Sequence, residues 1–326
     1  MTRIARQHGR KSERWLNGLD GTRGLAIVLA GMVVLGNAPR AYAQASEHQL
    51  TCSPEHTIGR ALRTLKPGDT LLVDGVCNEN VTIGPEFHRI TLDGQGVAAI
   101  NGDSTANSVT ILGTGITIRG FVITGGAPQG IAVTDGASAV IDGNIVQHAD
   151  RNGITVFRNS SADIINNTIQ NSGLAGIAVQ STSSARIGWL GPPNNRISAP
   201  NTIQNNAGQG IQIYRGSSSQ IFTNTIQNNG SHGIFLDRNA QAEVSATTIA
   251  GNGGDGIRVS RGSGLDLGTD ASGTTPNFDD DVDTGVNVGY GVRCLLGGFV
   301  DGRLGPLSGT SGGKIFSEAC VDSLVP

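Results

Sequence analysis

The residues with the greatest capacity for chemistry gather between residues 212 and 261. This segment carries arginine, aspartate, histidine and aromatic side chains, whereas equivalent positions earlier in the chain are mostly small. Guanidinium groups bind carboxylates and sulfates through paired hydrogen bonds, and aromatic rings stack on sugars. We therefore expect this segment to bind an acidic polysaccharide. The candidate binding residues are Gln212, Arg215, Phe235, Asp237, Asp255 and Arg261.

The same segment also offers groups for proton transfer. Removing a proton beside a uronic acid carboxylate requires a base, an acid and a group that neutralises charge. This hypothesis requires the candidate side chains to converge. The alternative is that the arginines point into solvent or pair with Asp237 and Asp255. The candidate catalytic residues are His232, Tyr214, Arg238 and Arg258.

These residues keep fixed distances from a repeated Gly-Ile pair, which reveals the elements that must position them. The pairs recur at intervals of 23, 23, 34, 23 and 23 residues. Periods of this size are typical of stacked repeats. The pairs are Gly130-Ile131, Gly153-Ile154, Gly176-Ile177, Gly210-Ile211, Gly233-Ile234 and Gly256-Ile257.

Aliphatic side chains recur at four offsets from each glycine: one, three, eleven and sixteen residues later, once an 11-residue insertion is removed from the third repeat. Examples from one repeat are Ile131, Val133, Ile141 and Val146. Branched aliphatics favour strands, and helical periodicity is absent. Strands this short cannot form a sheet with their sequence neighbours, so each must stack on its equivalent one repeat later. The sequence predicts an all-β fold, a right-handed parallel β-helix with about 23 residues per coil.

A polar register supports the same coil. Asn144, Asn167, Asn201 and Asn224 lie fourteen residues after successive glycines. We expect them to stack at the bend between the second and third strands and to bond turn backbone and each other. His148 shares the register of Asn171, Asn205 and Asn228 at a later turn, and we interpret it as a turn residue.

Over roughly residues 80–270, these repeats resemble the pectate-lyase-like right-handed β-helix superfamily. The resemblance implies a fold but not an activity, because that superfamily contains lyases, hydrolases, epimerases and non-catalytic surface proteins. Ser231-His232-Gly233 is similar to the Gly-His-Gly segment of polygalacturonases, but the paired acids that inverting hydrolysis needs are missing from the two preceding coils. The Asp-Pro-His-Asp signature of alginate epimerases and lyases is also absent.

Both ends of the repeat array are expected to carry caps. Thr57 can cap a short helix whose Ile58, Ala61, Leu62 and Leu65 share one face, ahead of Pro67-Gly68. Four cysteines lie in two distant pairs, and local pairing fits an elongated array, although three connectivities are formally open. We expect an N-terminal cap over residues 44–79, the β-helix over 80–270 and a C-terminal cap over 271–326. The expected disulfides are Cys52 with Cys77 and Cys294 with Cys320.

Residues 1–43 read as a signal peptide. A basic start precedes the apolar run Gly24–Gly36 and the segment Ala41-Tyr42-Ala43. The run is shorter than the roughly 20 residues of a membrane span, and an uncleaved anchor is the alternative. We expect a secreted or periplasmic protein with no membrane span after signal removal.

The remaining chain is acidic. Residues 1–43 carry seven of the Lys and Arg residues and two of the Asp and Glu residues, so the formal charge changes from −3 to −8 without them. Nucleic acids need a basic surface, which argues against them as partners. We expect a monomer that binds polysaccharide.

Two further features lie outside the regular coils. Asp279, Asp281 and Asp283 alternate as oxygen ligands of calcium would, but the loop lacks other EF-hand features, and a solvated acidic loop is the alternative. We expect no other cofactor and no protein-bound metal. The insertion, roughly Gly188–Ser198, should lie at the asparagine bend and serve as an edge decoration or contact.

The sequence thus predicts an exported β-helix that binds an acidic polysaccharide on the outward face of its C-terminal coils. Modification of that polysaccharide by a lyase or epimerase mechanism is one hypothesis. A non-catalytic glycan-binding protein and a structural protein of the cell envelope or surface are the alternatives.

Overall fold

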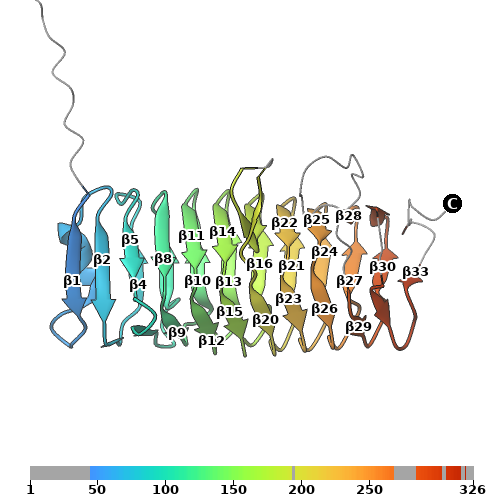
Figure 1. Ribbon diagram of the computed structural model, residues 1–326, viewed down its shortest axis with the longest axis horizontal. Helices are drawn as coiled ribbons and strands as arrows, with labels where there is room; N and C mark the ends of the chain where they lie inside the picture. Colours follow the sequence, from blue (N-terminus) through green and yellow to red (C-terminus); the bar gives the residue numbers. More distant parts are fainter. Residues whose placement is uncertain (1–44, 193–194, 268–283, 303–305, 317–319, 321–326) are drawn as a thin grey trace, which may run out of the picture. The chain divides into compact units, whose positions relative to one another are not determined.

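The computed structural model describes residues 45–192, 195–267, 284–302, 306–316 and 320. Within them the chain winds into a parallel β-solenoid, with three strands in each regular coil and each strand hydrogen-bonded to its equivalent in the next coil (Figure 1). The predicted all-β parallel β-helix is confirmed. Three long sheets run along the solenoid, named here by the order of their strands within a repeat.

The first sheet contains the strands that follow the Gly-Ile glycines. In chain order it consists of β4 (Val81–Ile83), β7 (Val109–Ile111), β10 (Gln129–Val133), β13 (Asn152–Phe157), β16 (Ile177–Gln180), β21 (Ile211–Tyr214), β24 (Ile234–Asp237), β27 (Ile257–Ser260), β30 (Val292–Leu295) and β33 (Ile315–Phe316).

The second sheet follows after a tight turn. It consists of β1 (Glu47–Thr51), β2 (Thr70–Asp74), β5 (Thr91–Asp93), β8 (Ile116–Arg119), β11 (Ser138–Asp142), β14 (Ser161–Ile165), β17 (Ser184–Ile187), β22 (Ser218–Phe222), β25 (Gln241–Ser245), β28 (Gly264–Leu267) and β31 (Phe299–Gly302).

The third sheet follows the asparagine bend. It consists of β3 (Val76–Cys77), β6 (Ala99–Asn101), β9 (Val122–Thr124), β12 (Ile145–Gln147), β15 (Thr168–Gln170), β20 (Thr202–Gln204), β23 (Thr225–Gln227) and β26 (Thr248–Ala250). Two small pairs complete the strands, β18 (Trp189–Leu190) with β19 (Ile197–Ser198) and β29 (Val286–Asn287) with β32 (Ser308–Gly309).

The aliphatic offsets form the core as predicted. Ile154, Ile177, Ile211 and Ile234 are partners in successive strands of the first sheet. All are fully buried, as are the aliphatics at the other three offsets. Burial of each such side chain stabilises the fold by roughly 1.5–3 kcal/mol. No single coil could enclose this core, so stability depends on stacking.

The asparagine register is a buried ladder. The backbone N–H and side-chain Nδ2 of Asn167 both donate to Oδ1 of Asn201, at 2.9 and 3.0 Å. Nδ2 of Asn201 donates in turn to the Ile164 carbonyl at 2.8 Å and to Oδ1 of Asn224 at 2.9 Å. These bonds satisfy backbone groups that the bend removes from the sheets. His148 has φ 56°, close to the values of Asn171, Asn205 and Asn228, which fits the interpretation as a turn residue.

Strand pairing extends beyond residues 80–270 at both ends. β1 pairs with β2 at the N-terminal end of the second sheet, and β30 pairs with β33 at the C-terminal end of the first. The coils near both ends lack the Gly-Ile pair. In the N-terminal coils, Asn80 and Ser108 take the place of the glycine, and in a C-terminal coil Gly291 is followed by valine instead of isoleucine. The repeat marker therefore underestimates the length of the solenoid.

The predicted cap elements are present. The helix α1 (Ile58–Ala61) continues into a short 3-10 turn, η1 (Leu62–Thr64), and the Thr57 side chain accepts the Arg60 N–H. Ile58 and Leu62 are buried against the core. Both predicted disulfides, Cys52–Cys77 and Cys294–Cys320, are formed. Within the described residues, no helix has the length and apolar character needed to cross a membrane.

Candidate functional site

The candidate residues fall into two groups at opposite ends of the strands of the first sheet. His232 and Asp255 each lie one residue before a Gly-Ile glycine, and Phe235 and Arg258, three residues later, are partners in β24 and β27. Tyr214 and Asp237 are partners at the other end. Five residues of extended strand, about 16 Å, separate His232 from Asp237. The strand thus places His232 and Asp237 at different ends of the first sheet, and the hypothesis that His232, Tyr214 and Arg238 converge stays a prediction.

The first group is a compact cluster around His232. Arg258 Nη1 lies 3.0 Å from Nε2, and the Asp255 N–H lies 2.9 Å from Nδ1. A neutral imidazole keeps one N–H, so only one of its nitrogens accepts at a time. When Nδ1 carries that proton it faces Asp255 Oδ2, 3.4 Å away. The Phe235 ring packs beside the imidazole, with centroids 5.6 Å apart. Groups of Arg258 and Asp255 thus lie against both ring nitrogens of His232.

Burial keeps His232 neutral. Removal from water lowers its pKa to about 4, Asp255 opposes this shift, and the charges of Arg258 and Arg293 add to it. The contact between His232 and Asp255 is therefore not an ion pair at neutral pH. Asp255 is 2% exposed; its Oδ1 accepts the Tyr290 N–H at 3.0 Å, while Oδ2 has no hydrogen-bond partner among the described residues. The cluster positions Arg258 rather than a reacting group.

The second group lies in the turn that leads from the first sheet to the second. Arg215, Arg238 and Arg261 occupy the same position of three consecutive coils, and we call this row the arginine edge. Their φ angles are 59°, 58° and 52°. Glycine adopts this left-handed conformation without strain, whereas other residues do so at a cost. Asp135, Arg158 and Ser181 have φ angles of 59°, 57° and 58° at the same position of earlier coils, so the left-handed turn is a property of the coil, and arginine occupies it in these three.

The arginine edge is only partly neutralised. Asp237, which is largely buried, accepts from Arg261 Nη1 at 3.0 Å and lies 3.4 Å from Arg238 Nε. Arg215 stacks on Tyr214, with its guanidinium carbon 5.2 Å from the ring centroid, and has no carboxylate partner within the described coils. One carboxylate thus serves two of the three cations, and about half of each side chain of Arg238 and Arg261 is exposed. Gln212 lies in register with Phe235, between the two groups.

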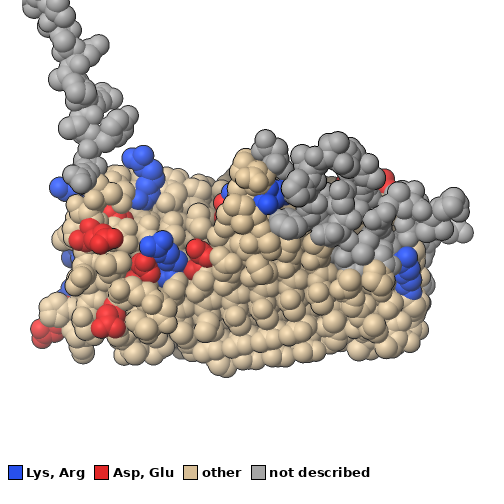
Figure 2. Space-filling view, in the orientation of Figure 1, with Lys and Arg blue, Asp and Glu red and all other residues tan. Residues whose placement is uncertain are grey.

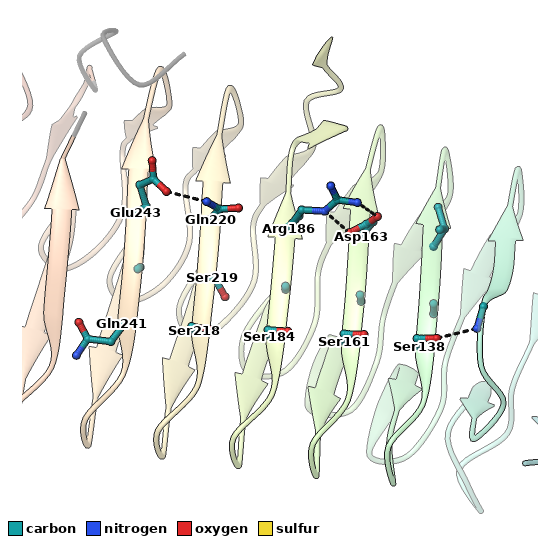
Figure 3. A pocket seen from close by; sticks show the side chains of 16 residues that line it. Ser138, Ser161, Asp163, Ser184, Arg186, Ser218, Ser219, Gln220, Gln241 and Glu243 are labelled. Carbon is teal, nitrogen blue, oxygen red and sulfur yellow. Dashed lines mark hydrogen bonds and ion pairs between the residues drawn. The ribbon is translucent and has the colours of Figure 1, made fainter. Parts of the chain in front are cut away.

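A groove on the outer face of the second sheet was not predicted. Its volume is about 780 Å³, and it extends over β11, β14, β17, β22 and β25 (Figure 3). Ser138, Ser161, Ser184 and Ser218 form a row of in-register partners along it. The signal was present in the sequence, since each serine lies eight residues after a Gly-Ile glycine. Serine is small and uncharged, so this offset alone does not indicate a ligand.

A second row of side chains borders the serines. Arg186 binds Asp163 through two hydrogen bonds, and the Gln220 amide donates to Glu243 at 2.8 Å (Figure 3). These groups are half-buried and satisfy one another. The row therefore adds polar contacts to the groove without an uncompensated positive charge.

The insertion closes the far side of this row. It forms the β18–β19 hairpin at the asparagine bend, as predicted, and packs beside β14. Trp189 is buried against Phe222, with ring centroids 5.7 Å apart, and the guanidinium of Arg196 lies over both rings. These three side chains form a stack of two aromatic rings and one guanidinium group that borders the groove. The sequence alone did not indicate this contact.

The third sheet contrasts with the other two. Its strands from β9 to β26 contain no charged residue, and Figure 2 shows an uncharged surface over them, whereas charges gather over the N-terminal coils. Glutamine amides form a ladder there: Gln204 Nε2 donates to Gln170 Oε1 at 3.1 Å, and Gln204 Oε1 accepts from Gln227 Nε2 at 2.9 Å. This face offers a control surface for the other two.

The potential metal ligands are dispersed in the described part of the chain. The only group there of three potential ligands within reach of one ion is Cys52, Cys77 and Glu79, whose cysteines form a disulfide. Copper prefers thiolate, thioether or clustered imidazole ligands. Both methionines precede residue 45, and the described histidines do not cluster. Asp279, Asp281 and Asp283 lie outside the described residues, so the calcium hypothesis stays a prediction.

Solved structures of similar fold are enzymes that act on polysaccharides. Pectate lyase Pel9A superimposes with a TM-score of 0.55 at 12% identity, covering 86% of this chain and 79% of its own. The A-module of the Azotobacter vinelandii mannuronan C-5 epimerase AlgE4 gives 0.44 at 14% identity, covering 86% and 89%. An alginate lyase from Paenibacillus sp. str. FPU-7 gives 0.41 at 17%, covering 83% and 98%. At these identities the likeness shows the fold alone.

The sequence comparison is narrower but identifies a family. No curated protein matches the chain significantly. Residues 98–267 match a family model described as periplasmic copper-binding protein (NosD), which covers more than half of the chain. The described residues do not fit a copper site, so no copper chemistry follows for this chain. The match extends from β6 to β28 and so includes the regular coils. The chain belongs to the NosD family of parallel β-helix proteins.

Proposed function

We propose that this protein binds an acidic polysaccharide without modifying it, through the arginine edge of its C-terminal coils. The observation that carries the proposal is the partly neutralised row of Arg215, Arg238 and Arg261, held in one turn position at a conformational cost. Exposed guanidinium groups spaced by about 4.8 Å repel one another unless anions lie between them. A linear polyanion along the solenoid supplies these anions.

Two further observations bear on the proposal. His232 is neutral at pH 7, because burial lowers its pKa to about 4, and both of its ring nitrogens lie within 3.0 Å of other groups. The pectate lyase of similar fold acts on an acidic polymer, which is compatible with such a ligand here. The disulfides favour a location outside the cytoplasm, and we propose the periplasm or the cell exterior.

Binding and turnover can be measured together. The chain from residue 44 onward would be titrated with polygalacturonate, alginate, gellan and a sulfated glycan, and with a carboxyl-reduced polymer as neutral control. We expect saturable binding to at least one acidic polymer that weakens as salt increases, because charge contacts at exposed sites are screened. Proton NMR of each polymer after incubation should be unchanged. New unsaturated or inverted sugar signals would show an enzyme instead.

Arg238→Ala tests the arginine edge. We expect affinity for the acidic polymer to fall by about threefold to tenfold, because one exposed bidentate contact is lost. Arg158→Ala is the matched control: it occupies the same turn position in an earlier coil but is paired with Asp135. Equal losses in both variants, or none in either, would place the binding site elsewhere.

A further inference from the structure

The groove on the second sheet lies next to the arginine edge, and the two surfaces fit one ligand. We infer that the sugar chain lies in this groove along the solenoid axis, and that the ligand is a heteropolysaccharide in which neutral sugars separate the acidic ones. The inference rests on the proposed function and adds the position and composition of the ligand.

The groove presents hydroxyl groups at a constant repeat. Ser161, Ser184 and Ser218 are exposed side chains on three consecutive strands, and Ser138 begins the row (Figure 3). Adjacent strands are about 4.8 Å apart, so each coil adds one hydroxyl at that interval. A hydroxyl both donates and accepts. Such a row matches a polymer whose own hydroxyls recur along its axis.

The floor and the hairpin border disfavour a uniformly charged chain. Asp163 is neutralised by Arg186, whereas Glu243 accepts from the neutral Gln220 amide and lies 4.0 Å from Arg196. Carboxylates of a ligand that faced this border would meet two protein carboxylates whose own partners are already engaged. Neutral hydroxyl-bearing sugars avoid that repulsion.

Among the described residues, the cations available to anionic groups of the ligand lie at the opposite border. Arg215 and Arg238 lie three residues before Ser218 and Gln241, within about 10 Å along the chain. In the earlier coils the same turn position holds Ser181, or Arg158 paired with Asp135. Uncompensated positive charge therefore borders only the C-terminal part of the groove, which favours acidic sugars there and neutral sugars in the rest.

A groove-filling variant tests this placement. In Ser184→Phe with Ser218→Phe, two rings occupy the floor at exposed strand positions that tolerate aromatic residues. The matched control is Thr202→Phe with Thr225→Phe, which changes outward positions of the same two coils on the third sheet. We expect the groove variant to bind gellan, whose glucuronates are separated by neutral sugars, about tenfold or more weakly than wild type, and the control to bind normally.

The outcomes separate the inference from the function it rests on. If Arg238→Ala weakens binding but the groove variant does not, the groove is not the channel and the proposed function stands. If wild type binds polygalacturonate more tightly than gellan, the mixed composition is wrong. If wild type binds no acidic polymer, the proposed function itself fails.

A measurement on the unaltered protein covers the case in which the groove variant does not fold. Hydroxyl-radical footprinting with and without gellan should show protection at Val140 and at the surrounding second-sheet strands, with no change in the third-sheet strand β15. Protection limited to the first sheet would overturn the inference.

Discussion

Two rows of side chains lie at opposite ends of the second-sheet strands, and they use the same repeat differently. The asparagine ladder is buried, and Asn144, Asn167 and Asn201 bond the next coil through backbone and side chain. The arginine edge is exposed, strained in φ and short of carboxylates. The comparison teaches that a repeated position stabilises the fold where its polar groups are satisfied by other protein groups. Where they are not satisfied, the position is available to a ligand.

The core beneath both rows should be the most sensitive place to break the solenoid. Ile234→Asp buries a carboxylate among aliphatics with no partner, and the expected result is loss of the folded state at room temperature. Ile234 is fully buried and pairs with Ile211 and Ile257. Circular dichroism melting measures this. Phe235→Asp, at the next and outward-facing position, is the control; a variant at 234 that melted like wild type would contradict the inward register.

The ladder itself should come next in size. Asn201→Ala leaves the Asn167 N–H buried without a partner and removes one of the two donors to the Ile164 carbonyl, which keeps the Gly188 N–H; this costs about 1–3 kcal/mol of unfolding free energy. Gln204→Ala in the same coil removes a half-buried ladder that water can replace, and should cost less than about 1 kcal/mol. Denaturant unfolding compares the two. Equal losses of unfolding free energy in the two variants would contradict the distinction between the buried asparagine ladder and the half-buried glutamine ladder.

The His232 cluster should give a smaller and pH-dependent effect. The folded pKa of about 4 lies below the unfolded value of 6.5, so the unfolded chain binds more protons between these values. Stability should fall as pH decreases from about 6.5 to about 4, by at most about 3 kcal/mol. The His232→Gln variant should lose part of this dependence. An identical slope in both proteins would show that other groups cause the acid sensitivity.

Sequence reasoning recovered features that depend on local spacing. The Gly-Ile interval, the four aliphatic offsets and the asparagine register all repeat along one chain, and each repeat supplies the same contacts to the next. The cysteine pairs were also recoverable, because an elongated array brings only nearby cysteines together. Strand β1 and the strands after residue 284 were not predicted, since no Gly-Ile pair marks their coils.

The site was recovered only in part. Residues 212–261 include the arginine edge and the His232 cluster, but their separation by the length of a strand was not apparent from offsets alone. The serines recur eight residues after the Gly-Ile glycines, but the groove that they line was not predicted. The border formed by Trp189, Arg196 and Phe222 joins an insertion to a strand of the following coil, which no local pattern indicates.

The sequence by itself determined the coil, its registers, its buried ladder and its two disulfides, because a periodic chain can bury its aliphatics only by stacking equivalent strands. Tertiary structure decided which outward positions become a surface. Whether an exposed side chain lines a groove, pairs with a neighbour or stays available depends on distances between coils and on where an insertion folds. Those are set by packing across the second sheet rather than by the spacing of residues along it.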